Sequence, residues 1–354
     1  MHRRTGLAVG LLSLTVIGLE LIWMRLFSAE FYYAFAFLTL SLAVLGLGLG
    51  ALALRLWPRL AGEENLGWML AATGAAALAG PPLVFQLGLD FSKLLASWGQ
   101  TLAFVVALLL LGSAFFCGGM ALGLLFRHNS QQMPRLYMAD LVGAGAGVVL
   151  AVLLMNTLQT PAATFLTALP VLLASWLCLA GWRRLLPAAL AVGAVGLTFL
   201  APDLLQIERH NPGPVTYLHW DAMAKVRVFD FGDARAINID NAANTTAYGF
   251  DGDWEAVRKE KAEFGIDVGY LIKRFPRCTF MSLGSGAGPD VFQALYYDAA
   301  EIHAVEVNPH INRMMQDDSL PGFQRPPAPS RHLQWWNARS PWPPSTGTST
   351  RTPG

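Results

Sequence analysis

The chain divides into a long apolar part and a shorter polar part. Residues 1–202 form nearly continuous apolar runs separated by short polar loops, whereas residues 203–318 have the charge density of a soluble domain. About 20 apolar residues are enough to cross the hydrocarbon core of a bilayer. The first part therefore predicts an α-helical, multi-spanning membrane domain. The candidate segments are 5–27, 32–54, 67–88, 101–126, 138–158, 161–181 and 185–202.

Glycines recur at short intervals within these runs. Small residues let membrane helices approach closely, so we interpret them as packing positions, with a transport pathway as the alternative. They include Gly46, Gly48, Gly50, Gly143, Gly145 and Gly147.

Three ionisable residues lie within or beside the predicted helices. Glu20 lies deep in the first segment, with Arg25 near its end, and Asp140 opens the fifth. A charge at the bilayer centre costs about 2.5–3.5 kcal/mol on insertion scales. Glu20 is therefore expected to face other helices or to be protonated. For Asp140 we expect an interhelical hydrogen bond near the interface, with a functional site as the alternative.

Arginines on the loops predict the orientation, because cytoplasmic loops are enriched in positive charge. All fall on one side if the N-terminus is inside. Seven crossings would then put residue 203 outside, where no adenosine cofactor is normally supplied. Either one segment is re-entrant, or two segments are miscounted, or the soluble part faces out. We favour a miscount, and a soluble part that faces the cytoplasm from a bacterial inner membrane. The arginines are Arg3, Arg4, Arg55, Arg59, Arg127, Arg135, Arg183 and Arg184.

The polar part begins with a linker and a small β region, together covering 203–254. Alternating apolar residues at 225–230 and 236–240 predict a β-hairpin, and 245–250 predicts a third strand. The acidic stretch 251–255 suggests calcium, but it lacks the spaced ligands of a calcium loop. We interpret it as a polar loop before a helix over 255–275.

A glycine loop follows, in a second region that covers 255–318. A buried strand at 279–283 leads into Gly284, Gly286 and Gly288, and a helix is expected from Asp290. Glycine lets the backbone turn tightly and approach a ligand, and the helix would point its N-terminal amides at it. The next strand, 302–307, carries Glu306, placed to accept hydrogen bonds from ribose hydroxyls.

The spacing of the loop discriminates between cofactors. The dinucleotide pattern Gly-x-Gly-x-x-Gly needs glycine or alanine at position 289, where Pro289 stands. Gly-x-Gly-x-Gly, with Glu306 placed 18 residues after Gly288, instead favours an S-adenosylmethionine-type ligand, which has no pyrophosphate. A dinucleotide site and a loop that binds nothing are the alternatives.

Composition supports the membrane assignment and narrows the chemistry. The chain is 54% hydrophobic and 14% charged, against about 25% charged for soluble domains. A net charge of +1 gives no nucleic-acid signal, and three scattered cysteines imply neither a disulfide framework nor a metal cluster. Met1-His-Arg-Arg resembles the start of a signal peptide. The apolar run then continues through Glu20 and Arg25 without a cleavage site, which argues against one.

The segments Leu283-Gly-Ser-Gly-Ala-Gly-Pro-Asp290 and Ala304-Val-Glu-Val-Asn-Pro309 resemble the core of the spermidine synthase-like family, on the S-adenosylmethionine-dependent methyltransferase fold. Glu20-Leu-Ile-Trp-Met-Arg25 and the stretch 136–145 are similar to its membrane-fused bacterial members. The resemblance covers about residues 5–318. It implies a partial α/β Rossmann-like, methyltransferase-type domain preceded by a β-hairpin region.

By this resemblance the loop would bind S-adenosylmethionine or its decarboxylated form, and an aminopropyl or methyl group would move to a small-molecule amine or other acceptor. Asp290 would orient the loop or its helix. Ala287 stands near the place of an acidic residue that soluble members carry, and aminopropyl transfer needs a carboxylate base, for which no residue is nominated. The implied cofactor-binding residues are Gly284, Ser285, Gly286, Gly288, Asp290 and Glu306.

The last stretch, 319–354, contains eight prolines and no acidic residue, so we expect a disordered tail. The break after Asp318 suggests a frameshift or truncation, with a natural short form as the alternative. The chain would then be inactive as given. The functional alternative is a membrane transporter or scaffold whose soluble part is a degenerate ligand sensor.

Overall fold

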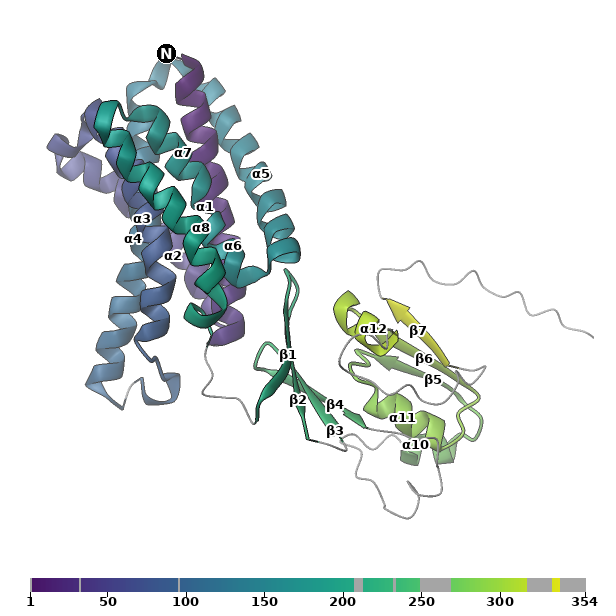
Figure 1. Ribbon diagram of the computed structural model, residues 1–354. Coiled ribbons are helices and arrows are strands. Elements are labelled where there is room, and N and C mark those ends of the chain that lie inside the picture. Colours follow the sequence, from purple (N-terminus) through teal and green to yellow (C-terminus); the bar gives the residue numbers. More distant parts are fainter. Residues whose placement is uncertain are drawn as a thin grey trace, which may run out of the picture. The chain divides into compact units, whose positions relative to one another are not determined.

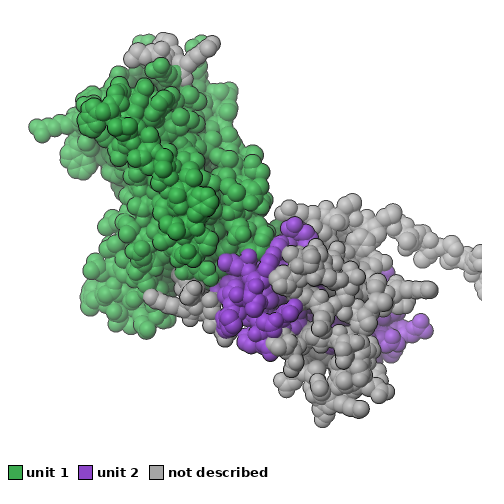
Figure 2. Space-filling model, in the orientation of Figure 1, with its two compact units in different colours: residues 1–210, 219–225, 240–242 green, residues 211–218, 226–239, 243–354 purple. Residues whose placement is uncertain are grey.

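The computed structural model describes residues 2–31, 33–94, 96–206, 213–231, 234–248, 269–316 and 333–337. The chain forms two compact units (Figure 2). Unit 1 comprises residues 1–210, 219–225 and 240–242, and unit 2 comprises 211–218, 226–239 and 243–354. Parts of the predicted helix over 255–275 and the whole acidic stretch 251–255 lie outside the described residues.

Unit 1 is built mainly of long apolar helices (Figure 1). Seven of its helical spans are long and apolar enough to cross a membrane, which confirms the predicted number and indicates a multi-pass membrane protein. This number gives no support to a miscounted segment. The helices are α1 His2–Glu30, α2 Phe35–Leu56, α3 Leu66–Gln86, α4 Trp98–His128, α5 Met133–Leu158, α6 Thr160–Leu166, α7 Leu169–Cys178 and α8 Leu185–Leu204.

The sixth span is broken into α6 and α7, where the sequence predicts one helix. Pro170 lies in the first turn of α7 and has no amide hydrogen to donate back to the preceding turn. The amide of Val171 donates instead to Thr15 Oγ1 on α1, at 3.0 Å. The backbone amide at the break is therefore satisfied by a side chain of a neighbouring helix.

Close contacts between α1 and α5 confirm the packing role predicted for glycine. A Cβ added at Gly143 would come within 3.0 Å of the Gly10 backbone, and one at Gly147 would crowd Leu14, whereas Gly145 faces open space. Ser13 on α1 also donates a hydrogen bond to Asp140 on α5. The interhelical hydrogen bond expected for Asp140 is thus present.

The N-terminal part of α1, the segment before α3 and the C-terminal ends of α4 and α7 meet at one end of unit 1. Arg4, Glu63, His128 and Cys178 line a single hollow there, although they come from four separate parts of the chain. The predicted arginine-bearing loops lie beside these residues in sequence. The basic loops therefore gather at the end of the bundle where α1 begins.

The first sheet has four strands in the order β1-β2-β3-β4. β2 and β3 are antiparallel, with Val226 opposite Ile239, and β3 pairs with β4 in the same way, which confirms the predicted hairpin and third strand. β1 has no counterpart in the prediction. The strands are β1 Val215–Trp220, β2 Lys225–Asp230, β3 Ala234–Ile239 and β4 Ala243–Tyr248.

The second sheet, in unit 2, has three described strands in the order β5-β6-β7, all parallel. Val291 and Ala294 of α11 pack with Ile302 and Ala304 of β6 in an apolar core. The described strands form a three-stranded parallel sheet, which does not by itself establish the Rossmann-like domain that the sequence predicts. The elements are α10 Gly269–Arg274, β5 Thr279–Leu283, α11 Pro289–Tyr296, β6 Glu301–Glu306, α12 Pro309–Gln316 and β7 Leu333–Asn337.

Two features of this sheet differ from the expectation. The sequence predicts a buried β5, yet Met281 is 41% exposed and Leu283 is 77% exposed. These two residues alternate with the less exposed Phe280 and Ser282, so the described residues leave one face of β5 uncovered. β7 lies in the stretch that was expected to be disordered, and it pairs with β6 from Ile302 opposite Leu333 onward. Its two tryptophans have the aromatic character that favours strands.

Candidate functional site

The loop between β5 and α11 has the backbone that its glycines predict. Gly284, Gly286 and Gly288 have φ angles of 76°, 54° and 80°, in the left-handed region that costs a residue with a Cβ about 1–2 kcal/mol. The amides of Gly284 and Ser285 both donate to the Val305 carbonyl, at 2.7 and 3.1 Å. The loop is therefore folded over the end of β6.

Glu306, the predicted ribose acceptor, lies against this loop. One carboxylate oxygen accepts from the amide of Gly286 at 2.9 Å, and the other accepts from the amide of Asn308 at 2.7 Å. The residue is only 5% exposed. Each carboxylate oxygen has a further lone pair, which is able to accept a hydrogen bond from a ligand hydroxyl.

Asp290 links the first turn of α11 to β5. Ser282 donates a hydrogen bond to its carboxylate, and the other oxygen accepts from the Val291 amide at 3.0 Å. A carboxylate in the first turn also interacts favourably with the helix dipole. These contacts tie the first turn of α11 to β5.

Thr245 on β4 is a member of the site that sequence reasoning missed. Its Oγ1 accepts from the Ala287 amide at 3.1 Å, and a Cβ added at Gly286 would lie 2.9 Å from the same oxygen. Nothing in the pattern of β4 distinguishes this threonine from its neighbour. In the glycine loop itself, the hydroxyl of Ser285 is buried without a hydrogen-bond partner among the described residues.

The residues after β6 continue the polar cluster. Asn308 caps α12, because its side chain accepts from the His310 amide at 2.8 Å. His310, which is 4% exposed, contacts the Tyr217 hydroxyl at 2.9 Å, with the two rings stacked. Burial raises the pKa of Tyr217, so this phenol stays protonated at neutral pH.

A second polar cluster lies within unit 1, where α1 ends. Glu30 and Lys225 form an ion pair with neither side chain exposed to solvent. Arg25 pairs with Asp240, and its Nη1 lies 3.1 Å from Oδ2 of that residue. The ammonium of Lys225 lies 5.0 Å from the centre of the Trp220 ring. Sequence reasoning placed Arg25 in a membrane segment and gave it no partner.

Asp221 holds the turn between β1 and β2 together. Its Oδ1 accepts from the amides of Met223 and Ala224, both at 2.7 Å, and His219 lies 3.6 Å from its other oxygen. Burial by itself would raise the pKa of Asp221, but the hydrogen bonds from His219 and the two amides outweigh it and hold the pKa below the usual value. The carboxylate is therefore charged at neutral pH.

Among the described residues, no group of three or more His, Cys, Asp or Glu side chains is arranged to hold a metal ion. No family model, curated protein or solved structure matches this chain.

Proposed function

We propose that this chain is a membrane-anchored transferase of the spermidine synthase-like kind, which binds an S-adenosyl sulfonium donor at the loop between β5 and α11. One observation carries the proposal. Three left-handed glycines bring the loop backbone to the carboxylate of Glu306, at the end of the neighbouring parallel strand. A carboxylate at that place, with a lone pair left on each oxygen, suits a ligand with ribose hydroxyls.

The reaction would be the transfer of an aminopropyl or methyl group. The nucleophile of the acceptor attacks the carbon next to the positive sulfur, the carbon–sulfur bond breaks, and the sulfur keeps the electron pair as a neutral thioether. The proton of an attacking amine passes to a base, for which we nominate no residue within the described part of the chain. The protein's main task is to hold donor and acceptor in line.

Calorimetric titration of the purified full chain with S-adenosylmethionine, its decarboxylated form and NAD tests the proposal. We expect heat with a sulfonium ligand and none with NAD. Glu306→Gln should weaken binding at least tenfold, since a hydrogen bond to a charged group is worth about 1.5–3 kcal/mol. Glu301→Gln is the matched control, because Glu301 begins the same strand and its side chain is 47% exposed. Binding of neither sulfonium ligand would contradict the proposal.

The function also requires the soluble residues to face the cytoplasm, where the donor is found. Glu30 and Asn156, which contact the 219–225 and 240–242 loops, lie at the ends of α1 and α5 away from the basic loops. We therefore propose that the basic end faces outward from a bacterial inner membrane, against the positive-inside tendency. Arginine distribution alone would favour the opposite orientation.

Cysteine labelling in intact cells decides between these orientations. Single cysteines at Ser130, in the loop between α4 and α5, and at Arg274, in α10, are introduced after the three native cysteines are replaced. A membrane-impermeant maleimide should label position 130 and spare position 274. The reverse pattern would contradict the transferase and favour the transporter or scaffold.

A further inference from the structure

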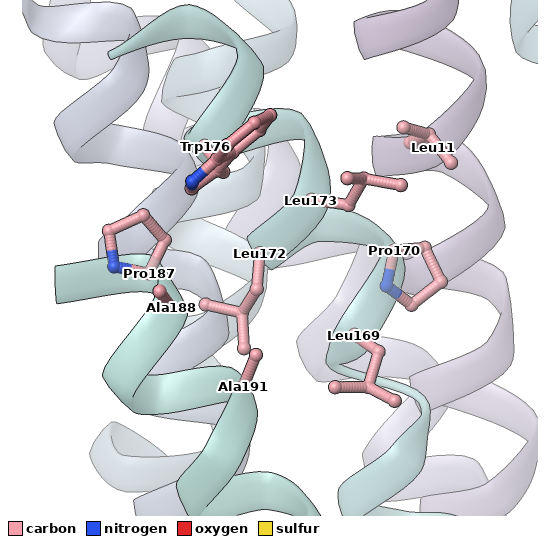
Figure 3. A pocket seen from close by; sticks show the side chains of 9 residues that line it. All are labelled: Leu11, Leu169, Pro170, Leu172, Leu173, Trp176, Pro187, Ala188 and Ala191. Carbon is pink, nitrogen blue, oxygen red and sulfur yellow. The ribbon is translucent and has the colours of Figure 1, made fainter. Parts of the chain in front are cut away.

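An apolar groove of about 460 Å³ runs between α1, α7 and α8. Leu172 and Leu173 of α7 lie between Leu11 on one side and Ala188 of α8 on the other (Figure 3). Every lining side chain except that of Trp176 is purely hydrocarbon. Because the groove belongs to helices that are apolar enough to span a membrane, hydrocarbon chains are its natural surroundings.

A basic residue lies beside Trp176, one of the residues that line the groove. The guanidinium of Arg184 lies 4.7 Å from the centre of the Trp176 ring. Its Nε donates to the Leu179 carbonyl at 2.8 Å, the only hydrogen bond of Arg184 within the described residues, which leaves its two terminal nitrogens for a ligand. Arg184 directly precedes α8, and Ala188 follows four residues later, about one helical turn further along.

The dimensions of the groove suit a lipid. Trp176 and Leu169 are seven residues apart on α7, which corresponds to about 10 Å along the helix. Arg184, which directly precedes α8, is likewise seven residues from Ala191. The groove therefore extends from a cation into the apolar zone. The neighbouring Trp182 is 76% exposed, as expected for a side chain at the level of lipid headgroups.

We infer that this groove is a binding site for an anionic phospholipid, with one acyl chain along α7 and the phosphate against Arg184. A second copy of the chain would also cover the apolar surface, but it would not account for a guanidinium placed beside that surface. The inference goes beyond the proposed function and does not depend on it.

Native mass spectrometry of the full chain in detergent, titrated with phosphatidylglycerol or phosphatidylcholine of identical chains, tests this site. We expect phosphatidylglycerol to bind at least tenfold more tightly. Ala188→Phe, which fills the groove, should weaken its binding at least fivefold. Ala189→Phe is the matched control, because Ala189 is exposed on the same helix and does not line the groove.

Arg184→Gln should remove the preference for phosphatidylglycerol, and Arg183→Gln should keep it, because Arg183 is not the residue on Trp176. Soluble glycerol phosphate should not displace the lipid, since it lacks the chains. If Ala188→Phe does not purify as a folded protein, Ala191→Leu fills the deeper part of the groove instead. Equal affinity for the two lipids would overturn the inference, as would equal effects at positions 188 and 189, or a dimer without bound lipid.

Discussion

The ion pair between Lys225 and Glu30 makes a quantitative prediction, because neither side chain is exposed. Together with Arg25 and Asp240 the cluster carries two positive and two negative charges, so it is neutral. Lys225→Met keeps the length of the side chain and leaves the Glu30 carboxylate buried without its ammonium. Breaking a buried pair in this way costs about 3–5 kcal/mol.

The effect should be local, so hydrogen–deuterium exchange is the appropriate assay. The 219–225 and 240–242 loops hold three protected amides: Asp221 donates to the Ala224 carbonyl at 3.0 Å, Asp240 to the Lys225 carbonyl at 3.0 Å, and Lys225 to Asp240 Oδ1 at 2.8 Å. Exchange through local opening follows the free energy of that opening. A loss of about 3–5 kcal/mol should speed exchange by roughly two to three and a half powers of ten.

Two controls separate the buried pair from a general loss of charge. The double variant Glu30→Met/Lys225→Met removes both charges and should regain most of the protection, because an apolar pair can replace a buried ion pair. Lys93→Met removes a cation whose side chain is 68% exposed and which pairs with Asp90. It should leave the 219–225 loop unchanged. Equal exchange in the single and double variants would refute the reasoning.

Three further variants test other contacts. Gly143→Ala should destabilise the helices by about 1–3 kcal/mol through overpacking, whereas Gly145→Ala, which faces open space, should not lower the melting temperature. Asp221 has a lowered pKa, so the stability that it contributes is present above about pH 4 and is lost as the pH falls further. Asp221→Asn should therefore reduce the fall of the melting temperature between pH 5 and pH 3. An unchanged dependence of the melting temperature on pH would contradict this. Thr245→Val leaves the Ala287 amide without its acceptor, at a cost of about 1–3 kcal/mol. We expect faster hydrogen exchange at that amide, and an unaltered exchange rate would contradict the role of Thr245.

The sequence predicts the membrane part well, because a helix needs an apolar run of a length that is easy to recognise. It does not predict the break in the sixth span, which depends on Thr15 of α1 receiving the free amide of Val171. The hairpin is recognisable by alternation in Lys225–Asp230. β1 is not, since Thr216, His219 and their neighbours break the period of two.

The candidate site divides in the same way. Gly284 to Gly288 and Glu306 lie within one short segment, and their spacing is enough to suggest a loop and an acid at adjoining strand ends. Thr245 meets this loop from 42 residues away, and Lys225 meets Glu30 across 195 residues. Contacts between such distant positions are decided by tertiary packing, which local patterns do not specify.

The hydrogen bond between Ser13 and Asp140 bears on how the chain is made. The two residues are 127 positions apart, and at 5–20 residues per second the second is synthesised roughly 6–25 s after the first. During that interval the face of α1 that carries Gly10 and Ser13 has no α5 to receive it. When α5 arrives, α1 already offers a hydrogen-bond donor to Asp140, which lowers the cost of bringing that carboxylate into the bilayer.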